Sequence, residues 1–163
     1  MLEDIIEFIK DMLTYIIIIA IIILIRVYVI SSIEEVGDSM EPNFHDGNIM
    51  LMDTIGYKYL DFLAIKRFDV VVIEYDIPKY IIKRVIALPN EKISYTDNKL
   101  YINGSLVEEK HKINGITEDI EEIEIPSDMY FVLGDNREKS TDSRTFGLVP
   151  KNKIVGKPFL VIW

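Results

Sequence analysis

The sequence YIIKRVIALP (residues 80–89) decides the expected fold, because a run of apolar and β-branched residues closed by a proline is typical of a strand. The run FDVVVIEY (residues 68–75) has the same character and is followed by Pro78. Asn103-Gly104 stands between the short runs 99–102 and 105–107 and is the dipeptide most typical of a tight β-hairpin. Further short apolar runs lie at residues 48–52, 92–95, 129–133, 154–155 and 159–163.

These runs predict a mainly β domain whose antiparallel strands form a coiled or barrel-like sheet. Residues 31–48 are rich in turn formers, and residues 135–145 form a polar loop. Residues 108–124, called the acidic insert below, are interpreted as a loop. Outside the N-terminal region, only the segment from Thr54 to Ile65 has an arguable helical period.

The N-terminal region contains a long apolar run, from Met12 to Ile25. Fourteen helical residues span about 21 Å, which is short of a hydrocarbon core of about 30 Å, whereas a helix continued to Ile30 reaches about 28 Å. We therefore predict a transmembrane helix over residues 12–30, with Arg26 near one end. A short N-terminal segment (residues 1–11) precedes it, and the β domain (residues 31–163) follows. A buried core helix and a cleaved signal peptide are the alternatives, and the balance of positive charges leaves the orientation open.

Composition excludes several classes of function for the 163 residues. The net charge of -9 argues against nucleic acid as a partner, because phosphate binding needs clustered Lys and Arg. The absence of cysteine excludes disulfides and thiol catalysis. Only two histidines occur, His45 and His111, and we interpret both as exposed loop residues. No metal ion and no cofactor is expected.

Lys83 and Arg84 lie within the predicted strand 80–88, on opposite faces that are both apolar. An ordinary lysine is only about 0.04% neutral at pH 7, and burial lowers the pKa of a lysine. A buried Lys83 can therefore serve as a base that takes a proton from a serine hydroxyl. The alternative is an edge residue with its ammonium group in water.

Two polar stretches supply candidates that complete such a site. Ser39, in the run GDSMEP (residues 37–42), is either a nucleophile or part of a plain polar turn. In the run GDNREKSTDSR (residues 134–144), Ser140 is able to orient the amine of Lys83. The acids Asp135 and Asp142 are candidate partners for two arginines of the site, Arg84 and Arg144.

Together these stretches resemble the bacterial type I signal peptidases, membrane-bound Ser-Lys endopeptidases that remove signal peptides from exported proteins. The family motif S-M-x-P is matched at residues 39–42, the motif K-R on an apolar strand at residues 83–84, and the motif G-D-N-x-x-x-S-x-D-S-R at residues 134–144. The order of the motifs agrees as well. The motif positions are Ser39, Met40, Pro42, Lys83, Arg84, Gly134, Asp135, Ser140, Asp142 and Arg144.

The resemblance implies that Ser39 is the nucleophile, that Lys83 is the general base and that Ser140 holds Lys83. Asp142 and Arg144 are implied to stabilise the site, and an acyl-enzyme is the implied intermediate. The Ser39 N–H and a second donor are implied to bind the oxyanion. Some relatives carry a serine two residues before the nucleophile for this purpose, whereas this chain has Gly37, so the second donor is open: the Gly37 backbone, water or a neighbouring group.

The resemblance also implies a location and a substrate. The N-terminus is then cytoplasmic, and the catalytic domain lies outside the cell membrane against the lipid bilayer. Pre-proteins that bear signal peptides are the implied partners, bound extended along a sheet edge and cut after Ala-x-Ala-type sites. We expect a monomer. A self-cleaving repressor of the same clan and a membrane-anchored β module that binds peptides without cutting them are the alternatives.

Overall fold

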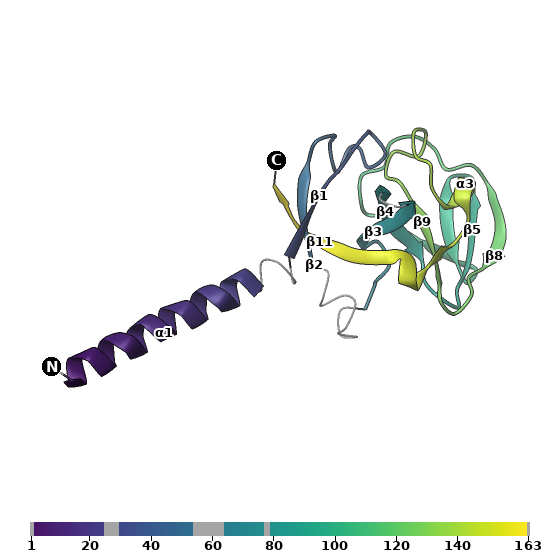
Figure 1. Ribbon diagram of the computed structural model, residues 1–163. Coiled ribbons are helices and arrows are strands. Elements are labelled where there is room, and N and C mark those ends of the chain that lie inside the picture. Colours follow the sequence, from purple (N-terminus) through teal and green to yellow (C-terminus); the bar gives the residue numbers. More distant parts are fainter. Residues whose placement is uncertain (1, 25–29, 54–63, 77–78, 163) are drawn as a thin grey trace.

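The computed structural model describes residues 2–24, 30–53, 64–76 and 79–162. A long helix is followed by a β domain, as Figure 1 shows. The elements are α1 (Leu2–Leu24), β1 (Ile30–Glu34), β2 (Ile49–Asp53), β3 (Val70–Asp76), β4 (Lys79–Ala87), β5 (Lys92–Thr96), β6 (Lys99–Ile102), β7 (Ser105–Val107), β8 (Ile120–Glu124), β9 (Met129–Leu133), α3 (Ser143–Phe146), β10 (Val149–Pro150), the 3₁₀ helix η3 (Lys151–Lys153) and β11 (Ile154–Ile162).

The larger sheet has seven antiparallel strands in the order β1-β2-β11-β3-β4-β9-β10. Strand β11 joins its two halves, because its first residues pair with β3 and its last residues pair with β2. The sequence predicted two separate strands here, at residues 154–155 and 159–163. The structure has one strand over Ile154–Ile162 with an irregular register around Pro158, since proline has no N–H for the ladder. Residue 163 lies outside the described residues.

The smaller sheet has the order β7-β6-β5-β8. Its tight hairpin confirms the prediction at Asn103-Gly104, where φ is +51° and +76°, as a type I′ turn requires. The prediction of a loop throughout residues 108–124 was wrong, because β8 occupies Ile120–Glu124 and pairs with β5. A register shift in this pair lets Ile120 and Ile123 both pack on the core, which hides the usual alternation of a strand.

Buried side chains form three clusters that fix the relation between the sheets. The cluster between the two sheets is built around Ile86, Tyr95, Leu100, Ile125 and Phe131. A second cluster lies along β3, β4 and β9. The third consists of Met40, Met50, Met52, Val72 and Ile82, so it joins the turn after β1 to strands β2, β3 and β4. Met40 has no exposed surface, and its burial contributes about 1.5–3 kcal/mol to holding this turn on the sheet.

Helix α1 projects away from the β domain, and its apolar side chains from Met12 to Ile23 are exposed (Figure 1). No helix within the described ranges combines the length and the apolar character needed to cross a bilayer. The helix predicted over residues 12–30 also ends differently, because Ile30 begins strand β1 and residues 25–29 lie outside the described residues. Strand β1 was missed because its sequence is rich in polar residues, which are more typical of a turn; these are Ser31, Ser32 and Glu34. The possible helix from Thr54 to Ile65 falls mostly on residues 54–63, which are not described.

Candidate active site

Ser39 lies in the turn that connects β1 to β2, and this turn is fixed from two sides. The side chain of Met40 is buried below it, and the N–H of Phe44 donates to the Met40 carbonyl at 3.0 Å. The N–H of Asn136 donates to the Ser39 carbonyl at 3.0 Å. Pro42 is exposed in the same turn, after a cis peptide bond. The backbone of the serine is therefore clamped by a loop nearly a hundred residues further along the chain.

Lys83 lies in the middle of β4 and is 3% exposed. Its Nζ donates to Ser39 Oγ at 2.8 Å and to the Ile82 carbonyl at 2.9 Å. Burial lowers the pKa of Lys83, and the carboxyl groups of Glu35, Asp142 and Asp135 oppose that shift. The alternative of an edge lysine with its head in water is therefore wrong for this structure.

Arg84, the next residue of β4, points to the other face and forms a buried ion pair with Asp135. Its Nε and Nη2 donate to the two carboxylate oxygens at 2.7 and 2.5 Å, and its Nη1 donates to the Phe68 carbonyl at 2.8 Å. The amide of Asn43 donates to the same carboxylate at 2.8 Å. Asp135 thus connects the strand of Lys83 with the turn of Ser39.

Asp142 and Arg144 form a second such pair at the start of α3. Asp142 accepts from Arg144 Nε and Nη2, both at 2.8 Å, and from the N–H of Gly134 at 3.1 Å. Arg144 also donates to the Arg137 carbonyl at 2.8 Å. The two acid–arginine pairs that the sequence left open are therefore Arg84 with Asp135 and Arg144 with Asp142.

Ser140 does not make the hydrogen bond expected from the family resemblance. Its Oγ is buried and has no hydrogen-bond partner among the described residues. The side chain instead packs against Gly134, where an added Cβ would collide with Ser140 and would lie 2.5 Å from the Ser39 carbonyl oxygen. The structure therefore places Ser140 and Gly134 beside the backbone of the serine.

Gly37 has φ of +95°, a conformation that favours glycine. Its N–H donates to Asp46 Oδ1 at 2.7 Å, so this N–H is already engaged and is not a free oxyanion donor. The N–H of Ser39 makes no hydrogen bond with any described residue. Of the two backbone donors considered from the sequence, only that of Ser39 is available.

Glu35 is the site residue that the sequence interpretation missed. It is 3% exposed, and Ser39 Oγ donates to its Oε1 at 3.2 Å. Burial raises the pKa of Glu35 to about 7, against the opposing effects of Lys83 and of the Ser39 hydrogen bond. A signal was present, since Glu35 is two residues after Ile33, which is partly buried against the third cluster, and therefore continues its inward face.

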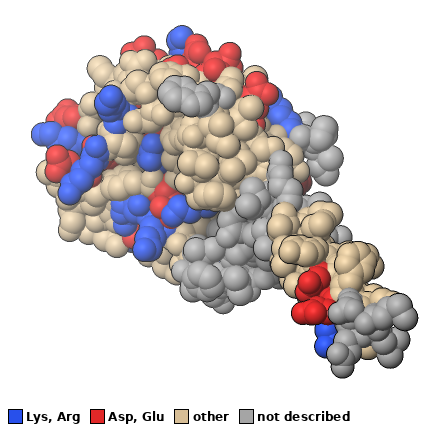
Figure 2. Space-filling model, turned by 90° about the vertical axis from the view of Figure 1, so that its left-hand side faces the viewer, with Lys and Arg blue, Asp and Glu red and all other residues tan. Residues whose placement is uncertain are grey.

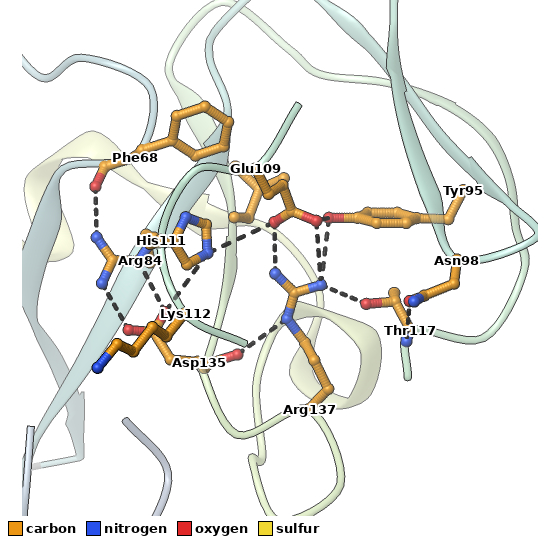
Figure 3. A network of polar contacts seen from close by, with 12 residues as sticks. Phe68, Arg84, Tyr95, Asn98, Glu109, His111, Lys112, Thr117, Asp135 and Arg137 are labelled. Carbon is orange, nitrogen blue, oxygen red and sulfur yellow. Dashed lines mark hydrogen bonds and ion pairs between the residues drawn. The ribbon is translucent and has the colours of Figure 1, made fainter. Parts of the chain in front are cut away.

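A buried polar network extends from this site to the acidic insert, as Figure 3 shows. Arg137 donates to Glu109 at 2.5 Å and to the hydroxyl of Thr117. Glu109 also accepts from the Tyr95 hydroxyl at 3.0 Å. The insert is therefore pinned to the loop that carries Asp135.

His111 belongs to this network, so its interpretation as an exposed residue was wrong. Its side chain is 9% exposed and lies 3.6 Å from Glu109 and 3.7 Å from Asp135. Burial and the nearby Arg84 lower its pKa. His45, by contrast, is 64% exposed beside Glu41, as predicted. Within the described part of the chain, no group of three or more His, Asp or Glu residues is placed to hold a metal ion.

Comparison with known proteins gives the class to which this fold and site belong. A family profile described as "Signal peptidase, peptidase S26" matches residues 5–163. Signal peptidase I of Bacillus caldolyticus is 37% identical over 153 residues, covering 85% of this chain and 82% of that relative. Signal peptidase IB of Staphylococcus aureus is 34% identical over an alignment of 177 positions, covering 94% and 91%. The crystal structure of a signal peptidase I from Enterococcus faecalis V583 has a TM-score of 0.50 and 34% identity, covering 57% of this chain and 95% of that one.

The chain therefore belongs to the signal peptidase family, peptidase S26. It is a hydrolase of the serine endopeptidase type, and the reaction of its family is the cleavage of signal peptides from pre-proteins.

Proposed function

We propose that the chain cleaves signal peptides with a Ser39–Lys83 dyad. The observation that carries this proposal is the 2.8 Å contact between Nζ of the buried Lys83 and Oγ of the half-buried Ser39. A nucleophile and a base within hydrogen-bond reach, with the base desolvated, are the requirements for an activated serine. The lowered pKa of Lys83 supports the same role, because it increases the neutral fraction of the amine.

The chemistry proceeds in two steps. Neutral Lys83 takes the hydroxyl proton as Ser39 Oγ attacks the carbonyl carbon, and the N–H of Ser39 donates to the oxygen that becomes negative. Lys83 then gives this proton to the leaving amine, which produces an ester on Ser39. Water attacks the ester while Lys83 takes its proton, and the proton returns to Ser39 as the acid leaves. The other charged residues of the site hold its geometry; these are Arg84, Asp135, Asp142 and Arg144.

The free edge of β4 is the proposed binding site for the substrate. Strand β9 pairs with β4 only over Arg84–Ala87, so the edge of β4 before Arg84 has no partner strand within the described ranges on that side. Strand β3 covers the opposite edge along this stretch. An extended peptide added here runs toward Lys83, which suits a signal peptide whose scissile bond follows an Ala-x-Ala site.

The domain is proposed to work as a monomer at the outer surface of the cell membrane, with the N-terminus cytoplasmic and the apolar run that begins at Met12 of α1 as the anchor. The last four residues of β11 described here, Phe159 to Ile162, are exposed, and so is Ile49, the pairing partner of Ile162. Figure 2 looks at the side from which α1 projects and shows a broad uncharged surface there. Exposed apolar surface of this kind fits contact with lipid.

Cleavage of a peptide with an Ala-x-Ala site by the purified full chain tests the function. Ser39→Ala and Lys83→Ala should each lower kcat/KM by at least about 10³-fold with an unchanged melting temperature. Ser105→Ala and Lys99→Ala, at exposed positions of the smaller sheet, are the matched controls. Cleavage by either dyad variant at the control rate contradicts the dyad. A wild-type protein that binds the peptide and leaves it intact favours the peptide-binding module.

A further inference from the structure

Glu35 is held rigidly against the proposed catalytic pair, although it lies outside the three motifs at residues 39–42, 83–84 and 134–144. Its N–H donates to the Asn48 carbonyl and its carbonyl accepts from the Gly47 N–H, both at 2.9 Å. This backbone pairing continues the β1–β2 ladder by one residue and directs the side chain inward. Glu35 Oε1, Ser39 Oγ and Lys83 Nζ then form a chain of two hydrogen bonds, 3.2 and 2.8 Å long.

The charge of Glu35 is less compensated than that of the other acids near Lys83. Asp135 and Asp142, from the loop after β9, each have an arginine that donates two hydrogen bonds. No arginine or lysine of the described residues lies within ion-pair distance of Glu35. Two acids, Asp46 in the turn before β2 and Asp135, also act on Glu35 and raise its pKa. Lys83 is therefore the cation to which an ionised Glu35 responds.

The hydrogen bonds define where the protons lie when Glu35 is ionised. A carboxylate only accepts, so the Ser39 hydroxyl hydrogen points to Glu35. Ser39 Oγ then accepts from an N–H of Lys83, and the negative charge of Glu35 favours the ammonium form of that lysine. In this state the serine hydrogen faces away from Lys83, and an ammonium group has no lone pair with which to take it, so attack on a peptide carbonyl does not begin.

We propose that Glu35 is a positioning residue of the cleavage reaction, which draws the Ser39 hydrogen toward itself, favours protonated Lys83 and so restrains the dyad until Lys83 releases its proton. This inference rests on the proposed function of the Ser39–Lys83 pair. It assigns Glu35 a role opposite to that of the acid in a Ser-His-Asp triad, because there the acid favours the reactive arrangement. Removing the charge of Glu35 should therefore make Lys83 easier to deprotonate.

The test is the pH profile of kcat/KM for the full chain of Glu35→Gln, with Glu34→Gln as the control. Glutamine keeps the size and the hydrogen-bonding ability of Glu35 and removes its charge, whereas Glu34 is exposed and carries the same charge on the neighbouring residue. We expect the midpoint of the acid limb to move to lower pH in Glu35→Gln only. One pH unit below the wild-type midpoint, its kcat/KM should rise about threefold or more. Glu35→Asp, which keeps the charge, should hold the midpoint closer to that of wild type.

Two outcomes overturn the inference. A Glu35→Gln profile with the same midpoint as Glu34→Gln shows that Glu35 is only structural, and a fall in kcat of about 10²-fold or more with no acid-side gain shows that Glu35 assists catalysis. If Glu35→Gln does not fold, Glu35→Val places an apolar side chain at the same buried position and should shift the midpoint in the same direction. The proposed function fails separately, when Lys83→Ala still cleaves. An inactive Lys83→Ala with an unshifted Glu35→Gln profile overturns the inference alone.

Discussion

Gly134→Ala should inactivate the enzyme without unfolding it. The backbone of Gly134 lies outside the left-handed region, so alanine is free to adopt it, and the effect is purely steric. The added Cβ would lie 2.5 Å from the Ser39 carbonyl oxygen, about 0.9 Å closer than the 3.4 Å at which ordinary contact begins. The same Cβ would also collide with the side chain of Ser140.

The magnitude follows from what has to move. Overpacking of this kind costs about 1–3 kcal/mol of stability, which leaves a folded protein. The carbonyl of Ser39 is also the acceptor of the Asn136 N–H at 3.0 Å, so relief of the collision shifts the serine relative to Lys83. A misplacement of about 1 Å in a catalytic group reduces the rate by about 10²-fold.

Peptide cleavage and thermal unfolding measured on the same samples decide this prediction. Gly104→Ala is the control, because nothing lies within 4 Å of its added Cβ and its φ is +76°. That control should lose about 1 kcal/mol of stability through backbone strain and keep its kcat/KM. If Gly134→Ala keeps kcat/KM within about threefold of wild type, the serine is not held by the loop at residues 134–136 and the reasoning is refuted.

Three further changes test the buried charges. Asp135→Asn removes the ionic partner of buried Arg84 and should lower the free energy of unfolding in urea by about 3 kcal/mol, whereas a loss below 1 kcal/mol contradicts a buried pair. Arg137→Met removes the arginine that pairs with Glu109 and should cost about as much, with faster hydrogen exchange across the acidic insert; unchanged exchange argues against pinning. Burial raises the pKa of Glu35 from 4.5 to about 7, so its contribution to stability is full below pH 4.5 and is lost as pH rises through 7. In urea titrations between pH 4.5 and 8, the free energy of unfolding should fall by up to about 3 kcal/mol more in wild type than in Glu35→Gln. Equal falls in the two proteins disprove the prediction.

Much of the β domain follows from local sequence. The Asn103-Gly104 hairpin was predicted with both strands correct, because its turn conformation is accessible to few dipeptides. The strand at residues 80–88 was predicted within a residue at each end, since β-branched runs closed by proline are typical of strands. The motif residues were predicted as one site, and the contact between Ser39 and Lys83 joins two of them.

The features that escaped prediction depend on contacts between distant segments. Strand β8 is acidic and irregular in register, so its two inward isoleucines do not alternate in the sequence. His111 is buried because the acidic insert folds back on Asp135, which no local pattern reveals. Glu35 lies beside Ser39 because Asn48 extends the β1–β2 ladder by one residue. The acid that pairs with each arginine, Arg84 or Arg144, likewise depends on the path of the loop at residues 134–144.

The hydrogen bond from the Asn136 N–H to the Ser39 carbonyl also has a consequence for biosynthesis. A ribosome makes Ser39 and Lys83 well before it makes the loop that fixes the serine backbone. A nascent chain that ends before residue 134 therefore carries both residues of the proposed dyad without this hydrogen bond. We expect peptidase activity to arise late in synthesis, after β9 has paired with β4, and a prematurely released fragment to be inactive.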